Sequence, residues 1–111
     1  MSKSKNGWEW EDEKLILESC HDSQFSVNVL SDGNYLILLR CWSGELTISN
    51  RIIGKAVIDA NGNLISKPEK ILESDREDFP HLYTNSATFF SDNNYLMIPA
   101  MFSNDDKILI T

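Results

Sequence analysis

Apolar and polar residues follow a short period along most of the chain. Residues 25–29 alternate between the two kinds, which is the two-residue period of a half-buried strand. Residues 35–42 are apolar on both alternating faces except at Arg40, and this predicts a central strand that is covered on both sides. Residues 52–58 are rich in β-branched side chains and predict a further strand.

Three segments share one pattern, in which two apolar residues precede a polar cluster and a second apolar run follows. They are residues 29–37, 57–65 and 89–97, and their polar clusters are built from Asp, Asn, Gly and Ser. Asp-Gly and Asn-Gly pairs tolerate the positive φ angles that tight hairpin turns require. Each segment therefore predicts a strand, a turn and a second strand.

The ends of the chain add shorter elements. Residues 95–102 predict a strand that Pro99 places at a sheet edge or a bulge, because proline donates no ladder hydrogen bond. Residues 107–110 predict a closing strand, and residues 14–18 an opening one.

The stretch 67–85 is the least strand-like part of the sequence. It contains Pro68, Pro80 and an acidic run, and it predicts a long acidic loop, although one helical turn over residues 69–75 also fits. Together the elements predict a single all-β domain over residues 1–111. We expect seven or eight antiparallel strands in consecutive hairpins, arranged as a sandwich, a curved sheet or a propeller-blade-like unit.

Acidic residues outnumber basic ones, 17 to 10, which gives a net charge of −7. Such a surface repels phosphate backbones and anionic lipid headgroups, so nucleic acid and membranes are excluded as expected partners. A basic protein is favoured instead. The alternative is that the charge only keeps the protein in solution.

The start of the chain predicts a cytosolic protein. Residues 1–7 are polar, are expected to be flexible, and lead into an acidic stretch instead of an apolar signal core. The longest apolar run, residues 35–39, is too short to cross a bilayer. Cys20 and Cys41 lack C-x-x-C spacing, so we expect two free thiols, with a disulfide only if the fold brings them together.

Residues for catalysis or metal binding are few. The two histidines are His21 and His81, and a strand would point Cys20 and His21 to opposite faces. The alternating oxygen side chains of residues 59–63 lack the glycine and glutamate that complete a calcium loop, so they are better explained as a hairpin turn. The sequence therefore predicts a non-enzyme with no cofactor and no metal.

Two clusters remain as candidate binding sites for a protein partner. The first has two tryptophans followed by carboxylates: Trp8, Trp10, Glu11, Asp12 and Glu13. These aromatic rings either pack on the core, which we favour, or form an anchor ringed by acids. The second cluster lies on the predicted acidic loop and is either a solvated loop or a contact site: Glu73, Asp75, Glu77 and Asp78.

Residues 25–66 resemble one blade of certain bacterial β-propeller repeats. Those blades carry an Asp-Gly turn before an apolar strand, as at residues 32–33, and later a D-x-N-G-N-apolar run, as at residues 59–64. Residues 86–102 resemble the opening of a second unit, 60 residues further on. The resemblance implies antiparallel β structure. The chain is too short to close a ring of four or more blades, so a sandwich or an assembly with other copies is implied.

Size, acidity and the scarcity of catalytic residues are similar to the profile of small immunity proteins in bacterial toxin systems. That profile implies an inhibitor that blocks the active site of a basic toxin domain such as a nuclease. Two alternatives are a structural or self-assembling module, and a binder of small molecules or carbohydrates that stacks them on Trp8, Trp10 and Trp42.

Overall fold

The computed structural model describes residues 1–17, 19–20, 25–43, 50–83, 87–91 and 94–110. The predicted all-β antiparallel fold is confirmed: these residues form nine strands and no helix. The strands are β1 (Ser26–Val29), β2 (Tyr35–Trp42), β3 (Arg51–Ile58), β4 (Leu64–Leu72), β5 (His81–Leu82), β6 (Ala87–Ser91), β7 (Asn94–Met97), β8 (Ala100–Phe102) and β9 (Ile108–Ile110).

The first sheet is a meander in the order β1-β2-β3-β4, and every neighbouring pair is antiparallel. Strand β2 pairs with β3 over its whole length, from Tyr35 opposite Ile58 to Trp42 opposite Arg51. It lies inside the sheet, and three consecutive residues at its centre are buried. The prediction of a central strand covered on both sides is therefore confirmed.

Three hairpin turns share one geometry. At residues 30–34 the N–H of Gly33 donates to the carbonyl of Leu30, and Gly33 has φ of 88°. Residues 59–63 repeat this arrangement with Gly62 at 80°, and residues 103–107 repeat it with Asp106 at 62°. A left-handed residue at this place lets the turn match the twist of its two strands.

The turn at residues 59–63 is held by a carboxylate, as the hairpin interpretation expects. Asp59 Oδ1 accepts hydrogen bonds from the backbone N–H groups of Asn63 at 2.8 Å and Asn61 at 2.9 Å. The bond from the Asn63 backbone, followed by that from its side chain, lowers the pKa of Asp59. The oxygens of this turn thus serve its own backbone.

Strand β4 corrects the expectation of a long loop over residues 67–85. The strand continues to Leu72, so the residues between β4 and β5 are only 73–80, and no helical turn forms over residues 69–75. Pro68 is accommodated in a bulge, because Lys55 pairs with Glu69 while Val57 pairs with Ser66. Strand β4 is at the sheet edge, where proline costs no ladder hydrogen bond.

The N-terminal segment corrects two further expectations. Residues 14–17 are irregular where an opening strand was predicted, and residue 18 lies outside the described residues. Ile16 and Leu17 instead pack on the first sheet, and a disulfide joins Cys20 to Cys41 of β2. The expectation of free thiols is wrong because the segment folds back across the sheet. Disulfides are typical of oxidising compartments, whereas the cytosol keeps thiols reduced.

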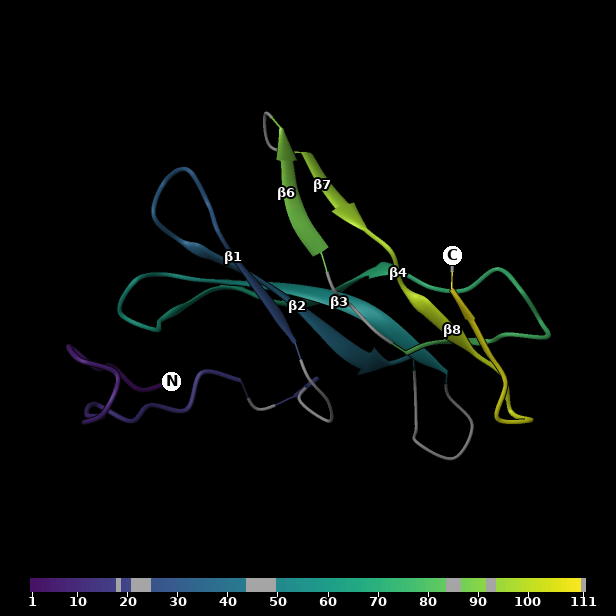
Figure 1. Cartoon of the computed structure of the whole chain (residues 1–111), viewed down its shortest axis with the longest axis horizontal. Helices are drawn as coiled ribbons and strands as arrows, with labels where there is room; N and C mark the ends of the chain where they lie inside the picture. Colours follow the sequence, from purple (N-terminus) through teal and green to yellow (C-terminus); the bar gives the residue numbers. More distant parts are fainter. Residues whose placement is uncertain (18, 21–24, 44–49, 84–86, 92–93, 111) are drawn as a thin grey trace.

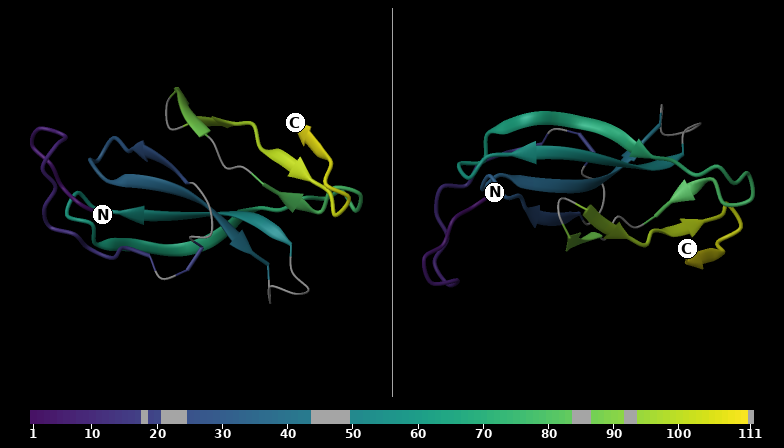
Figure 2. Two further views of the ribbon diagram at one scale, coloured as in Figure 1. Left: turned by 60° about the horizontal axis from the view of Figure 1, so that its bottom comes forward. Right: turned by 90° about the horizontal axis from the view of Figure 1, so that it is seen from above.

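The remaining strands form a second layer on the other face of the first sheet (Figures 1 and 2). This layer has a three-stranded sheet, β5-β8-β9, and a hairpin, β6-β7. Ile53 of β3 is buried against Leu82 and Met101 of this layer. The face of the first sheet that bears Ile37 and Leu39 is covered by the N-terminal segment. The first sheet therefore has an apolar cluster on each face.

We predict that loss of the disulfide weakens the fold without abolishing it. The bond closes a loop of 21 residues, for which the chain-entropy relation gives about 3 kcal/mol. The variant C20A/C41A should unfold at a lower urea concentration than the oxidised protein, and adding dithiothreitol should shift the oxidised protein by a similar amount. Equal urea midpoints for all three samples would contradict this contribution.

Candidate functional site

The N-terminal loop, residues 3–13, is compact, and backbone hydrogen bonds join its two ends. The N–H of Lys3 donates to the carbonyl of Glu11 at 2.8 Å, and Glu11 returns a hydrogen bond of 2.9 Å to Lys3. Inside the loop, Asn6 Oδ1 accepts from the backbone N–H groups of Trp8 and Glu9. An Asn side chain that caps the next residues is a common way to fix a tight turn.

Both tryptophans of this loop are exposed. Trp8 is 87% exposed and Trp10 is also mostly in solvent, so the favoured interpretation that they pack on the core is wrong. They lie in an irregular loop and not on a strand. The carboxylates of the same cluster, Glu11, Asp12 and Glu13, are exposed beside them.

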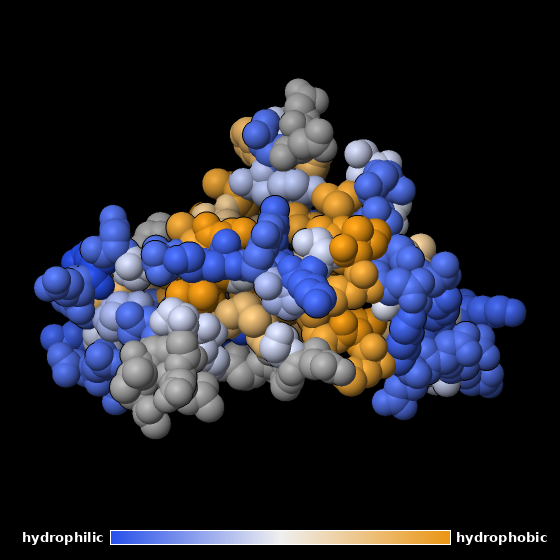
Figure 3. Space-filling view, turned by 180° about the vertical axis from the view of Figure 1, so that it is seen from behind, coloured by the Kyte–Doolittle hydropathy of each residue, from blue (hydrophilic) through white to orange (hydrophobic). Residues whose placement is uncertain are grey.

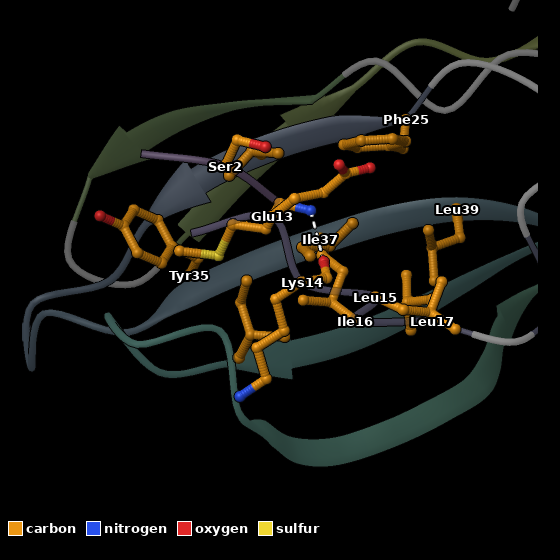
Figure 4. A pocket seen from close by; sticks show the side chains of 13 residues that line it. Ser2, Glu13, Lys14, Leu15, Ile16, Leu17, Phe25, Tyr35, Ile37 and Leu39 are labelled. Carbon is orange, nitrogen blue, oxygen red and sulfur yellow. Dashed lines mark hydrogen bonds between the residues drawn. The ribbon is translucent and has the colours of Figure 1, made fainter. Parts of the chain in front are cut away.

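An apolar groove of about 550 Å³ adjoins this loop. It lies between residues 13–17 and the outer side of β1 and β2, as Figure 4 shows for Tyr35, Ile37 and Leu39 facing the N-terminal segment. The terminal amino group of Met1 donates to the carbonyl of Lys14 at 2.6 Å and fixes one wall. Glu13 belongs to both the loop and the groove lining, so the two form one continuous surface.

Strand β1 contributes apolar side chains to this surface. The predicted alternation along residues 25–29 is present, but Val27 and Val29 are the exposed members while Ser26 and Asn28 are half-buried. The expectation of a buried apolar face on β1 is therefore wrong, because the N-terminal segment leaves β1 uncovered. Figure 3 shows the opposite side of the molecule, that of β4, where hydrophobic side chains also gather between hydrophilic ends.

Sequence reasoning missed the groove. Its walls come from Met1, residues 13–17, Phe25, Val27, β2 and Ile58, which are distant in sequence. The one signal that could have indicated it is the apolar side of the alternation at residues 25–29.

In the acidic loop, residues 73–80, some of the carboxylates already pair with cations of the same chain. Arg76 binds Asp78 through two hydrogen bonds, Nε to Oδ1 at 3.1 Å and Nη2 to Oδ2 at 2.8 Å. These bonds lower the pKa of Asp78 and raise that of Arg76. Lys70 forms an ion pair of 3.1 Å with Glu73. Asp75 and Glu77 are exposed on the same loop.

The structure does not bring the two predicted clusters together. The N-terminal loop and the acidic loop lie at opposite ends of the molecule in Figure 1, along its longest dimension of 46 Å. The three tryptophans do not converge either. Tyr35 lines the groove, whereas Trp42 ends the eight-residue strand β2, roughly 24 Å away at strand geometry.

Trp42 belongs to a separate cluster that the sequence did not indicate. The guanidinium of Arg51 lies over the Trp42 ring at 4.6 Å and over the Tyr83 ring at 5.5 Å. Buried His81 accepts a hydrogen bond at Nδ1 from the Arg51 backbone N–H, so Nε2 carries the proton that is donated to Asn104 Oδ1. The predicted loop over residues 67–85 would have included His81. Instead His81 lies in strand β5 and joins the two layers.

Among the described residues, no group of three or more His, Cys, Asp or Glu side chains is placed to hold a metal ion. No helix in that part of the chain is long and apolar enough to span a bilayer. Comparisons with family models, curated proteins and solved structures find no match.

We predict that fluorescence separates the two loop tryptophans from Trp42. Because Trp8 and Trp10 are exposed, the emission of the native protein should be red-shifted and strongly quenched by iodide. The variant W8F/W10F should leave a bluer, less quenched emission from half-buried Trp42. Emission that stays red-shifted and quenchable in this variant would contradict the placement of the tryptophans.

Proposed function

We propose that this protein is a non-catalytic binding protein that captures a basic protein through the N-terminal loop and the adjoining groove. In its specific form, the proposal is an inhibitor that blocks the active site of a basic toxin domain such as a nuclease. One observation carries it: two exposed tryptophans stand among carboxylates on a fixed loop beside an apolar groove.

The aromatic part of this surface suits protein binding. Tryptophan is among the residues most enriched at binding hot spots, because it brings a large apolar area at a small cost in rotamer entropy. Trp8 is held by the hydrogen bond from its backbone N–H to Asn6, so its position is partly fixed before a partner arrives. Fixing the loop in advance reduces the entropy that is lost on binding.

The charges of this surface favour a cationic partner. Within residues 3–13 four carboxylates stand against Lys3 and Lys5, and the whole chain carries a net charge of −7. Opposite potentials accelerate encounter between proteins, and carboxylates can occupy a site that binds substrate phosphates. The groove supports the same proposal by offering an apolar recess beside Glu13 for a side chain of the partner.

The N-terminal loop is favoured over the acidic loop for a physical reason. Asp78 and Glu73 already pair with Arg76 and Lys70, and a partner's cations would have to compete with those contacts. Asp75 and Glu77 remain, but no aromatic side chain on that loop is as exposed as Trp8. The acidic loop therefore supplies a matched control.

The test is co-expression with the product of the neighbouring gene. If that product is toxic, this protein should restore growth. The variants W8A/W10A and E11K/D12K/E13K should lose the protection and slow the association of the two purified proteins. Reversing two charges at the other end, in D75K/E77K, should leave protection intact.

Two outcomes would contradict the proposal. If the product of the neighbouring gene is harmless, the proposed inhibitor function is contradicted. Equal protection by W8A/W10A and the native protein, with both folded by circular dichroism, would show that the N-terminal loop is not the contact site.

A further inference from the structure

The chain contains a structural repeat of 60 residues. In the first unit Val27 pairs with Ile37, and in the second Ala87 pairs with Met97, at positions shifted by 60 on both strands. The shift also relates the next two pairs of β1-β2 to those of β6-β7. Strands β7 and β8 thus correspond to β2. Strand β9 corresponds to β3 at the shorter shift of 57, because Arg40 pairs with Ile53 as Ala100 pairs with Ile110.

Equivalent positions of the two units differ sharply in burial. Leu38 and Ile53 of the first unit are 4% and 0% exposed, because the second layer covers their face. Their equivalents in the second unit, Ile98 and Ile110, are 53% and 66% exposed. At these two positions, apolar side chains that are covered in the first unit are therefore exposed in the second.

These residues belong to one outer face of the second layer. In β8-β9, Phe102 pairs with Ile108 and Ala100 with Ile110, so these side chains share a face opposite to the inward-packing face of Met101 and Leu109. The β9 members of this face are exposed, whereas Ala100 is buried and the Phe102 ring packs against Tyr83. Large apolar side chains that are more than half exposed line this region: Leu96, Ile98, Ile108 and Ile110. Figure 2 shows the second layer with the first sheet on one side only.

The opposite end of the stack is already capped. The outward face of the first unit bears Ile37 and Cys41, which are buried under the N-terminal segment and tied to it by the disulfide to Cys20. Within the described residues, no comparable segment covers the second unit. A stack of units with one capped end and one open end is completed when two open ends meet, and this arrangement is a closed twofold dimer.

The exposed area is sufficient for such a contact. The chain exposes 7767 Å², whereas a folded monomer of 12.7 kDa exposes about 6,200 Å². This excess of roughly 1,500 Å² is spread over the whole molecule, the N-terminal loop included, and it leaves room for the ~800 Å² that each partner buries in a standard interface. An isologous contact uses the same patch on both copies, so one apolar face satisfies both partners.

We propose that the outer face of the second layer binds the same face of a second copy, and that the protein is a twofold dimer. This interface lies on β7, β8 and β9. It is separate from the N-terminal loop and the groove, so it leaves both copies free to bind a partner.

Sedimentation equilibrium of the full oxidised protein, from low to high micromolar concentration, tests the proposal. The native protein should fit a monomer-dimer equilibrium with a dimer of twice 12.7 kDa. The variant I110R should raise the dimer Kd by about 30-fold or more, the effect of losing one hot-spot residue. The matched control is V29R, because Val29 is 67% exposed on β1, outside the proposed interface. It should leave the Kd unchanged.

A native protein that remains monomeric at every concentration would overturn the proposal. A dimer that I98R and I110R both leave intact, or that only V29R dissociates, would place the interface elsewhere and overturn it equally. Far-ultraviolet circular dichroism of each variant confirms that the strands remain. Protection from a toxin is a separate readout, so either proposal can fail alone.

Discussion

The pairing of β2 with β3 is the constraint on which the rest of the structure depends. Eight consecutive residue pairs in one register place apolar side chains on both faces of the sheet, where one cluster meets the N-terminal segment and the other meets the second layer. Gly54 at the centre of β3 has no room for a side chain, since a Cβ would lie 2.7 Å from Cys41 Sγ and 3.1 Å from the Glu69 carbonyl oxygen. The absence of a Cβ lets the disulfide and strand β4 both approach β3 closely.

The parts of the fold that follow from local chemistry were predictable. Asp-Gly and Asn-Gly fix the turns at residues 30–34 and 59–63, because glycine adopts the left-handed conformation there without a steric penalty. The uninterrupted apolar run of β2 identifies a strand with cover on both faces. Periodicity and turn residues act over a few positions, so a sequence displays them directly.

The parts that depend on distant segments were not predictable. The alternation along β1 gives the period but not which side is covered, and Val27 and Val29 are exposed because the N-terminal segment lies elsewhere on the sheet. Pro68 suggested a loop, whereas an edge strand with a bulge accommodates it. The candidate site shows the same limit: both tryptophans were identified, but their exposure and the adjoining groove required the path of residues 13–17.

Hydrogen exchange of individual backbone amides, followed by nuclear magnetic resonance, tests the dominance of the β2-β3 pair most directly. Amides that close inter-strand hydrogen bonds in the interior of a buried sheet open only in large unfolding events, whereas those of an exposed hairpin open locally. The slowest exchange should therefore lie in β2 and β3, around Leu39 and Ile53, with faster exchange in β6, β7 and β9. Exchange in β6 and β7 that is as slow as in β2 and β3 would contradict the central position given to this pair.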